Sequence, residues 1–208
     1  MPDPTAYGSA NRTIANLVER SVHNRSDDAH RPPDHASMPL EICPHSDDHK
    51  AVIWNVYQFY CYDTSIEDEY DLEESGLYSL SDEYFSQYWT HPRWSAHLLR
   101  WDGVVAGFAL IEASEALDNA QELADVFVLK RYRRRGIARA VALHFLSHRV
   151  VPWTIVVFDE AMDAQAFWKS MFKEPRLQPA RRVADPDGRA VTVHVLEPNH
   201  IAAQTEGA

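Results

Sequence analysis

Residues 126–140 read VFVLKRYRRRGIARA and are the most informative stretch of the chain. A short apolar run typical of a strand meets five Arg or Lys side chains within six residues. Gly136 and an apolar-periodic segment typical of a helix follow. The unpaired N–H groups and the positive dipole end of a helix N-terminus favour a phosphate. Because Gly136 and Ala138 are small, backbone amides have room to approach such a group. The stretch therefore predicts a phosphate-binding turn between a strand and a helix.

Composition limits the class of protein. A length of 208 residues suits one medium domain with a sizeable core. The net charge of −11 argues against broad nucleic-acid binding, so the Arg cluster is local. No apolar run is long enough to span a bilayer, and the N-terminus lacks a signal-peptide core. With only Cys43 and Cys61, we expect a cytoplasmic protein with no membrane partner.

The order of elements predicts an α/β protein with a mixed sheet. Residues 1–38 are polar and read as a flexible or disordered tail, 39–198 as the folded domain, and 199–208 as a C-terminal tail. Asp102-Gly103 predicts a two-residue hairpin turn. Strands are expected at 39–43, 96–101, 104–111, 122–129, 153–158 and 191–196, and helices at 49–62, from Ser81, at 136–148 and at 163–172.

These features together resemble the GNAT family, the Gcn5-related N-acetyltransferases. The family's acetyl-CoA signature is matched by Arg133-Arg134-Arg135-Gly136-Ile137-Ala138, five residues after Val128, and its Ala-x-x-Phe-Tyr helix by 164–168. The resemblance covers residues 40–197. It implies the GNAT fold, a mixed central sheet splayed at the cofactor site with helices on both faces. It also implies acetyl-CoA as co-substrate.

The same resemblance assigns residues to the cofactor. The pantetheine amides would pair with the backbone of residues 126–128, and the pyrophosphate would sit on the amides of 134–138. Backbone N–H groups near Phe127 and Val128 would polarise the thioester carbonyl. The implied cofactor-binding residues are Val126, Phe127, Val128, Arg133, Arg134, Arg135, Gly136, Ile137, Ala138, Arg139, Phe167 and Trp168.

Three positions depart from the family pattern. The usual Tyr, a common general acid for the departing thiolate, is Trp168, whose indole N–H does not give up a proton near neutral pH. The Asn that often starts this helix is Ala161, and the Gly-Phe pair that closes it is missing. An acetyltransferase with this sequence needs another tyrosine or water as its acid.

Two carboxylates are candidates for the general base. An amine with a pKa of about 10.4 must lose its proton before it attacks, which costs roughly 4.6 kcal/mol at pH 7. Glu122 lies eleven residues before Arg133, the spacing at which histone-type family members carry their glutamate base, and Asp125 is the alternative. In a simpler interpretation, each is an acidic residue on a half-exposed strand.

The acceptor is less specified. Residues 51–92 contain nine acidic residues, no Lys or Arg, and many aromatic residues, which suits a cationic amine through Coulomb attraction and cation–π contact. The candidate substrate-binding residues are Tyr60, Tyr62, Glu69 and Tyr78. Alternatively, this region is a solvated acidic loop above an aromatic core.

The sequence therefore predicts an acetyl-CoA-dependent N-acetyltransferase whose small-molecule or protein primary amine, for example a small cationic amine, attacks the thioester directly. A catalytically silent GNAT-like module that senses acyl-CoA is the alternative. An Arg-rich nucleic-acid patch is a third reading, although no nucleic-acid partner is expected. His45 and His49 lack further ligands at convincing spacing, so no metal is expected. Homodimer formation stays open.

Overall fold

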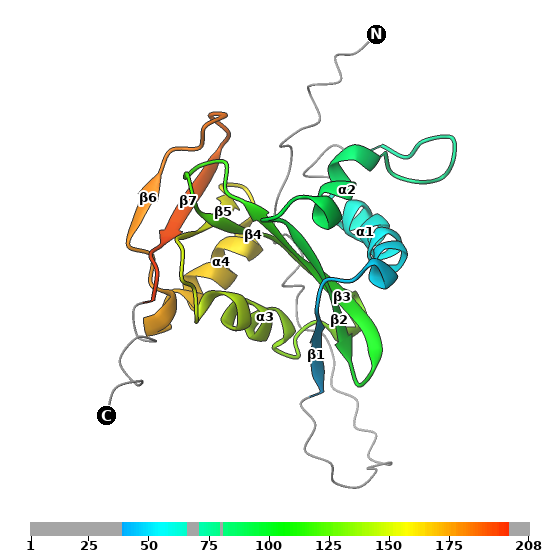
Figure 1. Ribbon diagram of the computed structural model, residues 1–208, viewed down its shortest axis with the longest axis horizontal. Helices are drawn as coiled ribbons and strands as arrows, with labels where there is room; N and C mark the ends of the chain where they lie inside the picture. The colour runs from blue at the N-terminus through cyan, green and yellow to red at the C-terminus, as the bar shows by residue number, and fades with distance from the viewer. Residues whose placement is uncertain (1–38, 66–70, 80, 200–208) are drawn as a thin grey trace, which may run out of the picture.

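The computed structural model describes residues 39–65, 71–79 and 81–199. At its centre is a seven-stranded sheet in the order β1-β2-β3-β4-β5-β7-β6 (Figure 1). The strands are β1 Leu40–Cys43, β2 Ser95–Trp101, β3 Val104–Ala113, β4 Gln121–Val128, β5 Trp153–Phe158, β6 Arg181–Val183 and β7 Val191–Leu196. The predicted N-terminal tail, residues 200–208 of the predicted C-terminal tail, and Glu69 lie outside the described residues.

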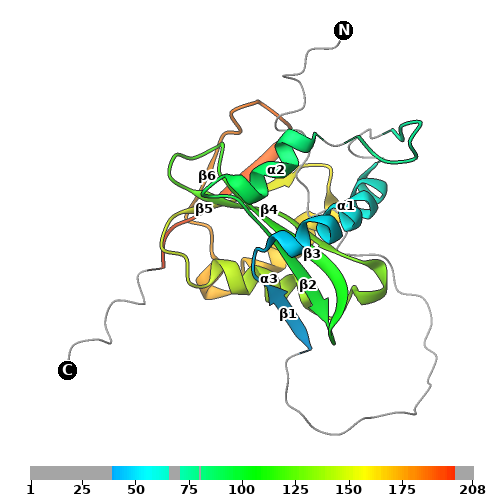
Figure 2. The same ribbon diagram turned by 45° about the vertical axis from the view of Figure 1, so that its right-hand side comes forward.

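Four α-helices cover the sheet on both faces. They are α1 Lys50–Thr64, α2 Asp82–Thr90, α3 Ile137–Leu146 and α4 Met162–Met171. Helices α1 and α2 lie on one face of the first strands, and α3 and α4 lie on the other (Figures 1 and 2). The start of α2 agrees with the sequence, because the Ser81 side chain accepts a hydrogen bond from the Tyr84 N–H at 3.1 Å.

Local chemistry also explains the hairpin between β2 and β3. Asp102 and Gly103 have φ values of 50° and 74°, the two successive left-handed residues of a type I′ turn. In contrast, β6 was not predicted. It pairs antiparallel with β7 but is only three residues long, and two of these are exposed arginines. The sequence therefore shows neither the length nor the apolar alternation that would predict a strand.

The sheet opens between β4 and β5. The two strands run parallel and pair only at Gln121–Trp153 and Glu122–Thr154, after which they separate. Strand β5 then pairs with β7 along its whole length. The predicted splay is confirmed, and the apolar run at 153–158 owes most of its pairing to an antiparallel neighbour.

A bulge in β4 lies beside this opening. Leu110 pairs with Asp125 and Ile111 with Leu123, so Ala124 is an extra residue in β4. The bulge lets residues 124 and 125 both approach the α1/α2 face. Ala124 belongs to the apolar cluster there, and Asp125 bonds to a side chain of α1. Val126 and Val128 pack on the α3/α4 face.

Candidate active site

The turn before α3 has the backbone geometry of an anion site. Arg134 and Gly136 both adopt left-handed conformations, with φ values of 66° and 78°. The first backbone bond inside α3 runs from the Ala140 N–H to the Gly136 carbonyl, at 2.9 Å. The N–H groups of residues 137–139 therefore precede the helix's own bonding ladder and can serve a ligand.

Glycine is needed at position 136 for conformation. A Cβ at Gly136 would meet no atom of the protein within 4 Å, so space inside the protein does not require glycine. A φ of 78° does, because it strains an L-amino-acid side chain. Arg134 adopts a similar φ without being glycine, a feature that the sequence did not reveal.

A cavity of about 410 Å³ adjoins this turn. The turn and the start of α3 form one side of it, and Ala166, Phe167 and Ser170 of α4 form the other. The structure thus brings Phe167 to the predicted phosphate turn. Trp168 lies elsewhere: it is 1% exposed, belongs to the core and stacks on Phe172.

The opening between β4 and β5, called the fork from here on, leaves one edge of β4 unpaired. This open edge leads to the cavity. The Leu129 N–H donates to the Ala106 carbonyl of β3 at 2.8 Å. Because backbone groups alternate in direction along an antiparallel strand, those of Phe127 also point toward β3. Those of Val126 and Val128 point to the opposite side, where β5 has separated. Of the predicted backbone contacts, Val126 and Val128 face the opening and Phe127 does not.

The first arginine of the motif is engaged within the protein. The Arg133 Nε donates to the Val128 carbonyl at 2.8 Å, and its guanidinium forms an ion pair with Asp63 at the end of α1. Both side chains are below 10% exposed. The Lys130 Nζ lies 3.2 Å from the other Asp63 oxygen. Arg133 therefore fastens the turn to β4 and α1, and its side chain is a poor candidate for a phosphate ligand.

Three other cations of the cluster also contact protein groups. The Arg131 and Arg135 guanidiniums lie 5.7 Å from the ring centroids of Tyr132 and Trp101. The Arg139 side chain forms an ion pair with Glu174. The run of arginines thus divides among separate contacts, which weakens its interpretation as one continuous nucleic-acid patch.

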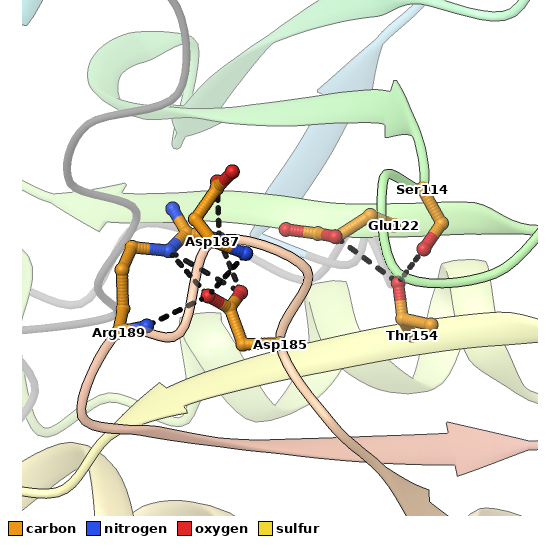
Figure 3. Close-up of polar contacts among 6 residues, drawn as sticks. All are labelled: Ser114, Glu122, Thr154, Asp185, Asp187 and Arg189. Atoms are coloured by element: carbon orange, nitrogen blue, oxygen red, sulfur yellow. Dashed lines mark hydrogen bonds and ion pairs between the residues drawn. The ribbon is translucent and has the colours of Figure 1, made fainter.

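Glu122 lies on β4 at the fork, in the last pair with β5. It is 2% exposed, and its carboxyl oxygen is 3.1 Å from the Thr154 hydroxyl, which in turn is 2.8 Å from the Ser114 hydroxyl (Figure 3). Figure 3 shows the three side chains converging from β4, β5 and the end of β3. The interpretation of Glu122 as a half-exposed surface residue is therefore wrong.

Asp125 lies three residues further along β4. It is also 2% exposed and accepts a hydrogen bond from the Tyr60 hydroxyl of α1 at 2.8 Å. The Tyr60 ring packs edge-on against Phe127, with centroids 5.8 Å apart. The structure thus joins one predicted base to one predicted substrate-binding residue.

A third buried carboxyl group was missed by sequence reasoning. Glu112 on β3 is 0% exposed and pairs in register with Glu122. It accepts hydrogen bonds from Tyr88 and, at 2.8 Å, from Tyr84, both on α2. The only available signal was its place in an otherwise apolar strand, 104–113.

The two remaining described acceptor candidates, Tyr62 and Tyr78, lie at different depths beside α1. Tyr62 is 63% exposed on α1, and its ring centroid is 6.0 Å from the Lys130 Nζ. Tyr78 is buried in the apolar cluster beneath α1, and its N–H donates to the Gln58 side chain at 2.8 Å. Residues 71–77 are exposed, as expected of a solvated acidic loop.

The loop between β6 and β7 is held by an internal ion pair. Two Asp185 oxygens accept from the Arg189 guanidinium, the shortest bond being 2.6 Å, and Asp185 also accepts from the Arg189 and Asp187 N–H groups. The bond to Arg189 lowers the pKa of Asp185, against the opposing effect of burial. Figure 3 draws this loop in the same view as Glu122.

Comparison with known proteins identifies the family. The model of the acetyltransferase (GNAT) family matches residues 60–171, more than half of the chain. The chain belongs to the GNAT family. Its general activity is therefore that of an acetyltransferase. The matched segment runs from Tyr60 to Met171 and contains both the predicted phosphate turn and the buried carboxyl groups of Glu112, Glu122 and Asp125.

Solved structures share the fold of this GNAT protein. An acetyltransferase from Thermus thermophilus is 20% identical, with a TM-score of 0.57 over 78% of this chain and 98% of the other. The Salmonella typhimurium protein yncA, solved with its cofactor acetyl-CoA, is 14% identical (TM-score 0.51, 82% and 100%). A Salmonella typhimurium acetyltransferase that modifies the N-terminal serine of ribosomal protein L7/L12 is 11% identical (TM-score 0.51, 78% and 97%).

A search of curated proteins finds no match. Among the described residues, every helix is too short or too polar to cross a bilayer.

Proposed function

We propose that this protein transfers the acetyl group of acetyl-CoA to a primary amine by direct attack on the thioester. The observation that carries the proposal is the fork between β4 and β5. On one face of the sheet it leads to the cavity at the start of α3, and on the other it is bordered by buried carboxyl groups. A cofactor and an acceptor can therefore meet at the fork from opposite faces.

The cofactor would follow the open edge of β4. Its pantetheine amides would pair with the outward-facing backbone groups of Val126 and with the Val128 N–H, because Arg133 occupies the Val128 carbonyl. Its pyrophosphate would lie on the N–H groups of residues 134–138. The helix N-terminus contributes about 0.3–2 kcal/mol toward an anion. The left-handed conformations of Arg134 and Gly136 orient the backbone N–H groups of the turn, while Arg133 ties the turn to β4.

The base that removes the amine proton is Glu122 in this proposal, with Asp125 as the alternative. Glu122 lies at the fork itself, where the Thr154 hydroxyl donates to it, whereas Asp125 lies three residues further along β4 and is bound by the Tyr60 hydroxyl. The neutral amine attacks the thioester carbonyl carbon, the C–S bond breaks, and CoA leaves as the thiolate. The amine proton goes to the carboxylate. Trp168, in the core, is not placed to protonate the thiolate as the family's usual Tyr would.

The acceptor is proposed to be a cationic amine, because the α1/α2 face carries the buried carboxyl groups and the acidic residues of the 71–77 loop. Both small polyamines and protein N-termini fit this chemistry. The L7/L12-modifying neighbour makes a peptide with a free N-terminal serine a sensible member of a test panel. Both cysteines are free thiols, which suits action in a reducing compartment such as the cytoplasm.

Release of free CoA thiol from acetyl-CoA tests the proposal, measured with a polyamine, a lysine-containing peptide and a serine N-terminal peptide. Thiol release that depends on one of these amines is expected. Tight acetyl-CoA binding with no turnover on any of them would support a silent binding module, the alternative that Trp168 in place of the family's usual Tyr leaves open. Absence of acetyl-CoA binding would contradict both functions.

Gly136→Val tests the cofactor turn separately. A β-branched side chain at a φ of 78° distorts the turn that would hold the pyrophosphate. We expect acetyl-CoA affinity to fall about tenfold or more, as measured by calorimetry, since about 1–3 kcal/mol of strain is introduced. Val104→Ala, at an exposed position on β3, is the control. Unchanged affinity in the Gly136 variant would place the pyrophosphate elsewhere.

A further inference from the structure

Another cavity lies on the far side of α4 from the predicted phosphate turn. Its volume is about 670 Å³, a size that suits a small molecule, and it lies between α4 and strands β5, β7 and β6. Figure 1 shows α4 beside this end of the sheet. Ala166 of α4 borders both cavities, whereas the turn before α3 borders only the first. The proposed reaction does not use this second space, which we call the α4/β7 cavity.

Aromatic rings line the α4/β7 cavity. The Trp168 and Phe172 rings stack with their centroids 5.5 Å apart and an interplanar angle of 24°. The His194 ring of β7 continues the row, 4.7 Å from Phe172. Met162, which is 69% exposed at the start of α4, adds an apolar side chain to the lining. A row of this kind favours a ligand with a planar apolar body.

Trp168 also brings a buried hydrogen-bond donor to the cavity lining. Its side chain is 1% exposed, and within the described part of the chain its indole Nε1 has no hydrogen-bond partner. A buried donor without a partner costs free energy, which an acceptor atom of a ligand would recover. Trp168 stands where the family pattern has Tyr, and the proposed reaction gives it no role.

Three cations gather where the cavity meets the end of α4. Lys169 and Lys173 are four residues apart, so they project from the same side of the helix. Arg182 of β6 pairs in register with His194, whose ring packs on Phe172 at that end. Among the residues that the structure describes, none of the three cations forms an ion pair. Their charges are therefore available to an anion from solution.

The other titratable groups leave this end of the cavity positive. Burial and the charge of Arg182 lower the pKa of His194 to about 4, so its ring is neutral near pH 7. Asp159 is the one acidic residue among the described lining residues, and its carboxylate accepts from the Thr192 hydroxyl at 3.3 Å. Thr192 precedes His194 by two residues, about 7 Å along β7. Asp159 thus lies toward the start of α4, away from the cations.

We infer that the α4/β7 cavity is a binding site for a small organic anion with a planar apolar body. The body would lie along the Trp168 and Phe172 rings, and the anionic group would lie among the three cations, which favour charge-assisted hydrogen bonds. An acceptor atom of the same ligand would take the hydrogen bond of the Trp168 indole N–H. This site is separate from the proposed acetyl-CoA site and does not depend on the proposed function.

Phenyl phosphate and benzoate are the probes, because they place a phosphate or a carboxylate on the same ring. The titration follows the indole N–H signals of the six tryptophans by NMR, with the Trp168 signal assigned from its absence in Trp168→Phe. We expect at least one probe to shift the Trp168 signal saturably and further than the other five. Phenol and inorganic phosphate, each half of a probe, should bind about tenfold more weakly. An unmoved Trp168 signal with both probes overturns the inference.

Arg182→Gln tests the cationic end of the cavity. It should weaken binding of the probe about fivefold or more, because it removes one of three cations. Arg181→Gln is the matched control, since Arg181 is the neighbouring exposed residue but pairs with Glu197 and does not line the cavity. Lys169→Gln repeats the test on α4 if the Arg182 variant disturbs β6. Equal weakening in the Arg181 and Arg182 variants would indicate general attraction of anions and overturn the site.

Gly136→Val separates this site from the cofactor turn, whose N–H groups also attract anions. The probe should shift the Trp168 signal with the same affinity in this variant, and in the wild type saturated with acetyl-CoA. Loss of the shift in either case would place the probe at the cofactor site and overturn the inference. Absence of turnover with every amine would contradict the proposed function alone, because the NMR titration needs no acceptor.

Discussion

The candidate site has a backbone half on the α3/α4 face of the sheet and a side-chain half on the α1/α2 face, and the two halves are formed in different ways. On the α3/α4 face, a continuous segment of backbone, residues 126–139, offers N–H and carbonyl groups in a turn with two left-handed residues. On the α1/α2 face, buried side chains from β3, β4, α1 and α2 meet one another. A backbone site depends on local conformation, whereas a side-chain site depends on the packing of distant segments.

The largest effect is expected from the side-chain half. Glu122→Gln removes the proposed base without altering the cofactor turn, so kcat/KM should fall about 10²–10⁴-fold while acetyl-CoA affinity stays the same. Steady-state kinetics and calorimetry measure the two quantities. Asp125→Asn is the matched variant and should lose less activity. The reverse ranking would make Asp125 the base and Glu122 a supporting residue.

A second variant removes the ion pairs that connect the turn on one face to α1 on the other. Asp63 of α1 forms ion pairs with Arg133 and Lys130 of the turn, and the Asp63 and Arg133 side chains are almost fully buried. Asp63→Asn leaves the Arg133 charge without its partner, which should lower the free energy of unfolding by about 3–5 kcal/mol. Urea denaturation measures this loss. Asp71→Asn, at an exposed site, is the control, and equal stabilities would mean that the pair contributes nothing.

Sequence reasoning succeeded for the backbone half because its signals are local. The strand, the glycine and the helix start follow one another, so the turn could be located from 126–140 alone. The exceptions are non-local: Asp63, which neutralises Arg133, lies 70 residues away. The direction of the Phe127 backbone depends on its register with β3, which no single segment encodes.

The side-chain half was predicted only in fragments. Glu122 was predicted from a family spacing and Asp125 as the alternative nearer the motif, yet the burial and partners of both came from the structure. Glu112 carries no local motif, and its contacts with two tyrosines of α2 depend on how that helix packs on β3. Tyr62, which is 63% exposed beside Lys130, shows that an acidic, aromatic segment does not by itself bring every aromatic side chain to the buried carboxyl groups.

A third variant affects both halves through the strand that they share. Gly107 of β3 packs so closely on β4 that a Cβ there would lie 1.9 Å from the Phe127 carbonyl oxygen. Gly107→Ala must displace β4 at the position of the proposed cofactor contacts. We expect a loss of about 1–3 kcal/mol in unfolding free energy, with weaker acetyl-CoA binding. Thermal denaturation and calorimetry measure both, and a change in only one of them would show that the two halves respond separately.

The smallest effect concerns acid stability and belongs to the α3/α4 face. Burial lowers the pKa of His97 to about 4, and its ring packs on Phe145 of α3. Since the unfolded chain binds a proton below about pH 6.5 and folded His97 does not until about pH 4, stability should decrease as pH falls through this window. The unfolding free energy should fall by about 1–2 kcal/mol, because the His97 ring is only partly shielded from solvent.

His97→Gln removes this titration and should flatten the dependence of unfolding free energy on pH between 6.5 and 4. His194, whose pKa burial also lowers to about 4, packs on Phe172 of α4 and leaves a residual slope. Denaturation curves at several pH values compare the variant with the wild type. An identical slope in both would contradict the assignment of this acid sensitivity to His97.

The fork between β4 and β5 has a thermodynamic consequence for the whole domain. Because only two residue pairs join these strands, the two parts of the sheet share few backbone hydrogen bonds. A ligand that occupies the fork would supply bonds that the chain lacks there, and its binding free energy would add to folding stability. At a hundredfold excess over Kd, that linkage amounts to about 2.7 kcal/mol. The abundance of the folded protein in a cell would then follow the supply of its co-substrate.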